Sequence, residues 1–122
     1  MKMFFIVGLG SFLGGGFRYL IQKQLTDSIQ SSFPYSTLLI NITGCFFLGF
    51  LLGISNKYDF LSPETRLFLT TGLCGGFTTF STFSNDSLML LRDANYSYFF
   101  LYVILSVVVG IICTFLGYLI FK

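Results

Sequence analysis

Four long stretches of this chain are nearly free of charge, and they limit the folds that it can adopt. They run from Met3 to Ile21, interrupted only by Arg18, from Phe33 to Ser55, from Leu67 to Asn85 and from Ala94 to Phe121. Each is long enough to cross about 30 Å of hydrocarbon as a helix. Charged residues make up 10% of the chain, against roughly 25% in an ordinary soluble domain. We therefore expect an all-α membrane protein with four transmembrane helices.

The four helices are expected to form one transmembrane domain over residues 1–122, with spans at about 3–22, 33–55, 64–92 and 96–121. No Pro-rich or Ser-rich linker and no internal repeat divides the chain. The first span has one alternative interpretation as a signal peptide, because Lys2 precedes an apolar core and small residues follow at Gly14 to Gly16. Cleavage there would leave three spans and no extracellular domain to deliver, so the four-span interpretation is favoured.

The residues that catalysis most often needs are absent or scattered. Histidine is absent, which removes the commonest general base and metal ligand. The cysteines, Cys45, Cys74 and Cys113, lie in three different spans and form no CxxC pair, so they are expected to pack as small apolar side chains. No nucleophile–base pair is recognisable, and we expect no enzyme. A net charge of +2 is too small to indicate a nucleic-acid partner.

The charges near the helix ends do not fix an orientation. Four spans place both termini on one side, with Lys2, Lys57, Arg66 and Lys122 there and with Lys23 and Arg92 on the other side. This bias is weak by the positive-inside rule. Insertion in both orientations and a single orientation with the termini inside both stay open.

Three pairs of glycines are spaced for close helix contact in lipid. They are Gly10 with Gly14, Gly49 with Gly53, and Gly72 with Gly76. Packing within the four helices would account for some of them. Because four helices of this length enclose little volume, we also expect association with a second copy.

The stretch GGFTTFSTFSND, Gly75 to Asp86, is too rich in glycine and hydroxyl groups for a lipid-facing helix. Gly75 and Gly76 are the natural place for the third helix to break, near residues 75–79. In hydrocarbon, each unpaired N–H or C=O group costs several kcal/mol, so a break must be buried or satisfied by water or an ion. Free carbonyls there suit a hard cation such as sodium. The alternative is an unbroken helix with a glycine-rich packing groove.

Two aromatic rings and one amide could accompany an anion. Phe80 and Phe83 share a helix face, and the edges of aromatic rings are positive. Asn41, in the middle of the second span with Thr37 one turn before it, offers two donors that could replace an anion's water. The alternatives are a packing pair of rings and an interhelical hydrogen bond.

The fourth span carries a regular stripe at Tyr102, Ser106, Gly110, Thr114 and Tyr118. A period of four keeps these residues on one slowly drifting face, which indicates a polar track or a helix–helix seam. Apart from Glu64 and Arg66 at the start of the third span, charge within the spans is limited to Arg18, Asp86 and Arg92. Since no acid lies near the midplane, donors without negative charge favour an anion pathway.

Several motifs together resemble the Fluc (CrcB) family of fluoride channels over nearly the whole chain. They are GGGFRY at residues 14–19, STLLINITG at 36–44, GLCGGFTTFSTFS at 72–84, and Tyr102 followed by Ser106. The resemblance implies a multi-pass protein of a microbial cell membrane that exports fluoride passively and gives fluoride resistance. It further implies an antiparallel, dual-topology homodimer with two pores and a central structural sodium ion.

The resemblance also assigns roles to residues. It implies sodium binding by the backbone carbonyls of Gly75 and Thr78, and a fluoride pathway lined by Asn41, Phe80, Phe83, Tyr102 and Ser106. We expect supporting contacts from further polar residues: Arg18, Thr37, Thr79, Ser81, Thr82, Ser84, Asp86 and Thr114. The chain departs from the family where Asp86 replaces a common Glu, Ser36 a common Gly and Cys45 a common Ser.

Two other functions stay open at this point. The first is a proton-coupled exporter of small substrates, of the four-helix dual-topology type, in which Asp86 would carry the proton. The second is a structural membrane subunit that transports nothing itself. The expected partners are fluoride, the lipid bilayer and a second copy of the chain, with no nucleic acid.

Overall fold

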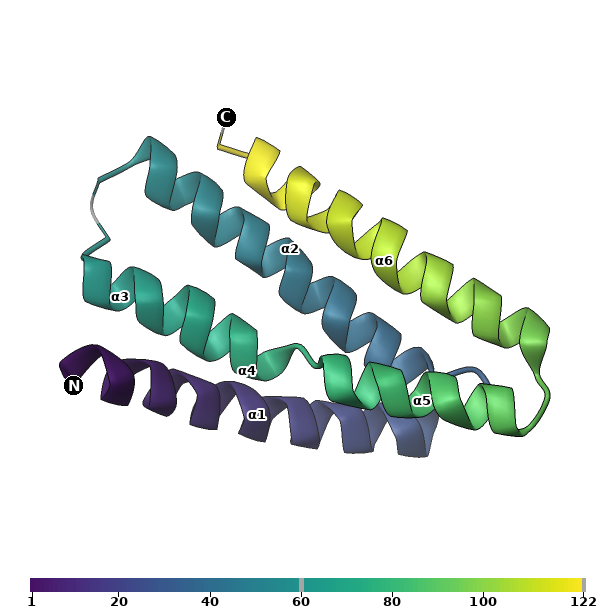
Figure 1. The fold of residues 1–122 in the computed structure, drawn as a ribbon. Helices are drawn as coiled ribbons and strands as arrows, with labels where there is room; N and C mark the ends of the chain where they lie inside the picture. The colour runs from purple at the N-terminus through teal and green to yellow at the C-terminus, as the bar shows by residue number, and fades with distance from the viewer. Residues whose placement is uncertain (60, 122) are drawn as a thin grey trace.

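The computed structural model describes residues 1–59 and 61–121, and all regular structure in these ranges is helical (Figure 1). The elements in chain order are α1 (Lys2–Ser28), α2 (Tyr35–Lys57), α3 (Pro63–Leu67), the π-helix η1 (Phe68–Cys74), α4 (Gly75–Phe77), α5 (Phe80–Arg92) and α6 (Tyr96–Leu119). By length and composition, α1, α2 and α6 could each cross a membrane. The third span is divided, with α3, η1 and α4 before the break and α5 after it. The expected four-helix membrane fold with a broken third helix is confirmed.

The break lies at Thr78 and Thr79, inside the predicted window but not at the glycines. Both threonines are extended, with φ and ψ of −79° and 158° at Thr78 and of −148° and 123° at Thr79. Thr79 caps α5, because its side chain accepts a hydrogen bond from the Thr82 N–H at 3.1 Å. Gly75 and Gly76 stay helical. The expectation that these glycines open the helix is therefore wrong; a threonine that caps the next helix does so.

The glycines bring helices into backbone contact instead. A Cβ atom on Gly76 would lie 2.6 Å from the Ser11 carbonyl oxygen, and one on Gly10 would lie 2.9 Å from the Gly72 Cα. A Cβ atom on Gly49 would overlap the Thr114 carbonyl. All three predicted glycine pairs are thus used within the chain, between α1 and the η1–α4 segment and between α2 and α6.

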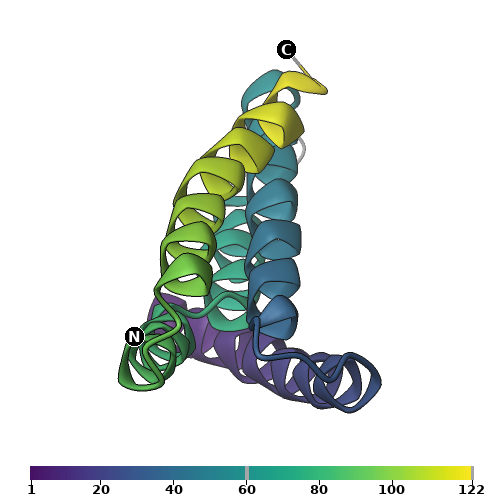
Figure 2. The ribbon, with the colours of Figure 1, turned by 90° about the vertical axis from the view of Figure 1, so that its right-hand side faces the viewer.

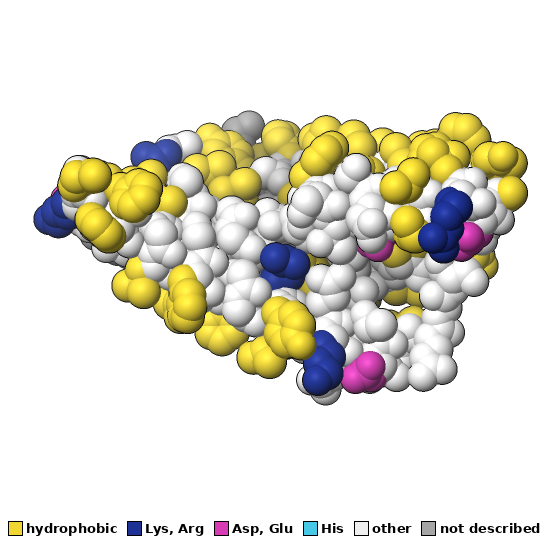
Figure 3. Space-filling view, turned by 60° about the horizontal axis from the view of Figure 1, so that its bottom comes forward, with side chains coloured by type: hydrophobic (Ala, Val, Ile, Leu, Met, Phe, Trp, Pro, Cys, Tyr) yellow, Lys and Arg dark blue, Asp and Glu magenta, His cyan; other side chains and the backbone are white. Residues whose placement is uncertain are grey.

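The helices splay rather than close into a bundle. Figure 2 shows α2 and α6 side by side, with α5 and the C-terminal end of α1 on opposite sides of this pair. The face in Figure 3 carries patches of hydrophobic side chains and few charged ones. Large apolar side chains are exposed on every long helix, for example Phe12, Phe47 and Ile111. So much apolar surface needs lipid or a second copy to cover it.

We predict that Gly14→Ala destabilises the protein while Gly8→Ala does not. A Cβ atom on Gly14 would overlap the Leu73 carbonyl, whereas nothing lies within 4 Å of one on Gly8. Because backbone atoms must move to make room, we expect Gly14→Ala to cost about 1–3 kcal/mol of unfolding free energy. Unfolding of both variants in mixed micelles measures this cost. Equal stability of the two variants would contradict the packing described for α1.

Candidate functional site

The amide of Asn41 on α2 pairs with the peptide group of Thr79 at the break. Its Nδ2 donates to the Thr79 carbonyl at 3.0 Å, and its Oδ1 accepts from the Thr79 N–H at 2.8 Å. This pairing satisfies one donor and one acceptor that the break would leave open in hydrocarbon. Asn41 therefore makes an interhelical hydrogen bond. An amide nitrogen carries two hydrogens, so one hydrogen of Nδ2 is not used in this pairing.

The hydrogen bonds around the break also divert two helical donors. In an unbroken helix the Thr79 N–H would donate to the Gly75 carbonyl and the Thr82 N–H to the Thr78 carbonyl. Here the first donates to Asn41 Oδ1 and the second to Thr79 Oγ1. The carbonyls of Gly75 and Thr78 thus lose the donors that a helix provides.

The neighbouring carbonyls keep partners. The Cys74 carbonyl accepts from both the N–H and the hydroxyl of Thr78, each at 3.0 Å. The Gly76 carbonyl accepts from Arg18 Nε at 3.5 Å, which places this cation beside the break. Within residues 75–78, the carbonyls of Gly75 and Thr78, which the resemblance assigned to sodium, are therefore among those without a helical donor, and the Phe77 carbonyl is another.

A groove of about 240 Å³ lies beside the break, between α2, α5 and α6. It is lined by Asn41, Cys45, Thr78, Thr79, Phe80, Phe83, Ser106 and Val107. The rings of Phe80 and Phe83 lie 5.6 Å apart between centroids, and Phe80 is 78% exposed. The Ser106 Oγ is out of contact with water and has no hydrogen-bond partner among the described residues. Four of the five predicted pathway residues are brought together here.

Tyr102, the fifth, lies apart from the lining of this groove. Its side chain is fully buried in the core with Phe33, Leu38 and Leu90. Its ring packs against Phe83 at 5.2 Å between centroids. Its hydroxyl donates to Asp86 Oδ2 at 3.2 Å. Tyr102 therefore connects the back of the groove to Asp86.

Buried polar groups continue from Asp86 toward α1. Thr37 is almost fully buried, and its hydroxyl lies close to the Asp86 carboxyl and to the Tyr102 hydroxyl. The same hydroxyl accepts from Gln22 Nε2 at 3.1 Å. Gln22 was not among the predicted site residues, because the first span was expected to end there, whereas α1 continues to Ser28. Gln22 follows Arg18 by four residues, and this spacing alone could have placed the two side chains on one helix face.

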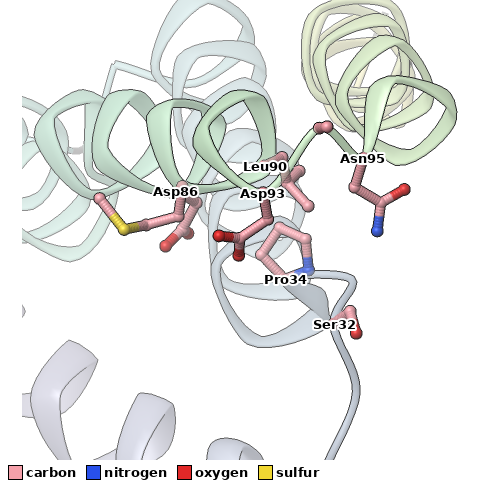
Figure 4. A pocket seen from close by; sticks show the side chains of 8 residues that line it. Ser32, Pro34, Asp86, Leu90, Asp93 and Asn95 are labelled. Carbon is pink, nitrogen blue, oxygen red and sulfur yellow. The ribbon is translucent and has the colours of Figure 1, made fainter.

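Asp86 also faces a pocket of about 420 Å³ at the end of the molecule where α5 turns into α6 (Figure 4). Asp93, Ser32 and Asn95 line the same pocket, and in Figure 4 the two carboxylates lie on the same side of α5. The turn depends on Ala94, whose φ of 56° is left-handed. This pocket shares no lining residue with the groove beside the break.

The remaining predicted residues make local contacts. The hydroxyls of Thr79 and Ser81 lie 3.3 Å apart, and Thr82 contributes its N–H to the cap on Thr79. Thr114 donates to the Gly110 carbonyl of its own helix at 3.0 Å. Ser84 is exposed on α5. None of these contacts tests a role in a pathway, so those roles stay predictions.

Comparison with known proteins agrees with the resemblance in the motifs. The model of the family described as CrcB-like protein, Camphor Resistance (CrcB), matches residues 5–118. A relative from Flavobacterium psychrophilum, named fluoride-specific ion channel FluC, is 43% identical over 122 residues, which are 100% of this chain and 98% of the relative. Relatives of the same name from Chlorobaculum tepidum (43% identical, 100% and 96% covered) and Azobacteroides pseudotrichonymphae (37%, 98% and 95%) match equally widely. The chain belongs to the CrcB family.

Proposed function

We propose that this protein is a fluoride-selective channel of the cell membrane, which lets fluoride leave the cell passively and so gives fluoride resistance. The family and the name of its relatives support fluoride as the ion. The observation that carries the proposal is the groove beside the break, because it combines hydrogen-bond donors and aromatic rings and has no charged residue in its lining.

The groove offers what a small, strongly hydrated anion needs. The unused hydrogen of Asn41 Nδ2 can replace water around the anion, and the hydroxyl of Ser106, which has no partner but is buried, would have to turn toward the groove to do the same. The rings of Phe80 and Phe83 can turn their positive edges toward it. Neutral donors bind weakly enough for an ion to leave again, which conduction requires. The pathway we propose runs through these residues, with Ser106 on its α6 side and Tyr102 buried behind Phe83.

We further propose that a structural sodium ion binds at the break. The carbonyls of Gly75 and Thr78 have lost their helical donors, and hard oxygen ligands of this kind suit sodium. Two carbonyls are too few for a complete site. An inverted second copy that brings the same two carbonyls would supply the rest, as an antiparallel, dual-topology homodimer with two pores does. When bound, the ion supplies positive charge close to the groove.

A proton-coupled exporter is the second candidate, because Asp86 faces a pocket large enough for a small molecule. Two observations favour the channel over it. Asp86 is not among the residues that line the groove, and its carboxyl is engaged by Tyr102 at 3.2 Å. The exporter also requires transport to follow a proton gradient, and the channel does not.

A fluoride channel needs only a fluoride gradient to drive transport. In liposomes containing the purified protein, a fluoride gradient should drive fluoride efflux at equal pH on both sides, with little chloride efflux. An ion-selective electrode measures both fluxes. Equal fluxes of the two halides would contradict the channel proposed here. Fluoride flux that appears only with a pH gradient and is lost in Asp86→Asn would support the exporter.

If fluoride passes through the groove beside the break, changes in the groove lining should lower the fluoride flux. Phe80→Ile removes a ring edge and should lower fluoride flux at least about tenfold. Phe12→Ile is the matched control and should not change the flux. The two rings are similarly exposed, Phe80 at 78% and Phe12 at 76%. Asn41→Asp should also lower the flux sharply, because it replaces the donor with a negative acceptor. Gel filtration of each variant checks folding. Wild-type flux in both groove variants would exclude this groove as the pathway.

If a structural sodium ion binds at the break, the stability and the fluoride flux should both depend on sodium. Removing sodium by dialysis against a large organic cation should lower both the thermal stability and the fluoride flux, and adding sodium back should restore both. Binding to the folded state alone raises its stability in proportion to the logarithm of ligand concentration. An unfolding midpoint that does not respond to sodium, measured in detergent at constant ionic strength, would count against a structural ion.

A further inference from the structure

A second polar pocket lies at the other end of the third span from α5. This pocket, which we call the Arg66 pocket, has a volume of about 450 Å³ and lies between the C-terminal end of α2, the start of α3, and η1. Its polar lining comes from Ser55, Asp59, Arg66, Thr70 and Thr71. None of these residues belongs to the groove beside the break.

The Arg66 guanidinium is the donor group of the Arg66 pocket that a ligand can reach, because Arg66 is exposed whereas Ser55 Oγ is buried. Ser55 Oγ is out of contact with water and has no hydrogen-bond partner in the part of the chain that the structure describes. Arg66 is exposed, and the ion pairs found within residues 1–59 and 61–121 join Lys2 to Glu64 and Arg92 to Asp93. A guanidinium carries five donors and stays charged at every physiological pH. A buried hydroxyl without a partner is costly unless a ligand or water satisfies it.

The other polar residues determine how strongly this pocket can hold an anion. Thr70 Oγ1 donates to the Arg66 carbonyl at 2.8 Å, which fixes the turn that carries the guanidinium. Asp59 brings a negative charge into the same lining and opposes an anion. One attracting and one opposing charge give weak binding, and a volume of about 450 Å³ leaves room for an anion with part of its water.

The η1–α4 segment runs from the Arg66 pocket to the break. On it, Thr71 and Gly75 are exposed and four residues apart, and Thr78 follows at the break, where the backbone is extended. Thr71 lines the Arg66 pocket, while Thr78 lines the groove with Asn41 and Phe80. The η1–α4 segment therefore joins the two sites in the chain, and an anion at the Arg66 pocket would lie at one end of this segment.

We propose that the Arg66 pocket is an entrance site that concentrates small inorganic anions, fluoride among them, before they reach the groove. The inference rests on the proposed channel function. Arg66 supplies the attracting charge, and Asp59 supplies the opposing charge that lets the ion move on. A charged site of this kind raises the local concentration of ions, and salt screens its effect.

The test is the initial rate of fluoride efflux from liposomes as a function of fluoride concentration at low ionic strength. Arg66→Gln should raise the half-saturating concentration about two- to fivefold with little change in the maximal rate. Arg66→Lys should restore most of the loss, and Asp59→Asn should shift the half-saturating concentration in the opposite direction. Lys23→Gln, the control at an exposed cation near the opposite end of α1, should change nothing. In about 1 M of an impermeant salt the differences should shrink, because the screening length falls to about 3 Å.

The outcomes separate this inference from the proposed function. If the wild type carries no fluoride, the proposed function fails and the entrance site with it. If the wild type carries fluoride but Arg66→Gln and Asp59→Asn leave the half-saturating concentration unchanged, the entrance site alone is wrong. The phosphate of a lipid headgroup shares the required chemistry. A change in stability that follows the phosphatidylglycerol content, without a shift in the half-saturating concentration, would assign the pocket to lipid and overturn the proposal.

Discussion

The structure depends on the pairing between the Asn41 amide and the Thr79 peptide. A helix broken in hydrocarbon exposes backbone groups at a cost of several kcal/mol each, and one side chain on α2 satisfies a donor and an acceptor together. The same pairing holds the start of α5 against α2, which places Phe80 and Phe83 beside Asn41. It also turns the Thr79 N–H away from the Gly75 carbonyl. The groove and the candidate cation site therefore have a common cause.

Close glycine contacts hold the two halves of the chain around this break. Gly10, Gly14 and Gly76 let α1 lie against η1 and α4, and Gly49 lets α2 lie against α6. Because these contacts use the small residues inward, the outer faces keep large apolar side chains such as Phe12 and Phe80. The chain therefore presents an apolar surface in which the polar groups gather at the groove and at the two end pockets.

The fold could be predicted from the sequence because hydrophobic length determines a membrane helix, and the four runs are long. The break lies inside the expected window of residues 75–79 but not at the glycines: glycines tolerate a helix when a neighbour packs on them, and the Thr79 cap decides where α5 begins. The burial of Tyr102 could not be predicted, since the rotation of α6 depends on its contacts with α2. The roles of the pathway residues, the sodium ion and the dimer stay predictions, because they concern ions and a second copy.

We propose that fluoride binds beside Asn41 through the amide hydrogen that the break does not use. Nuclear magnetic resonance of the Asn41 side-chain amide, during titration with fluoride, tests this directly. One of the two Nδ2 hydrogens donates to Thr79, so we expect a large shift of the other hydrogen with fluoride and a small one with chloride. If neither hydrogen shifts, or if chloride shifts them equally, fluoride does not bind at this amide and the account of the groove is wrong.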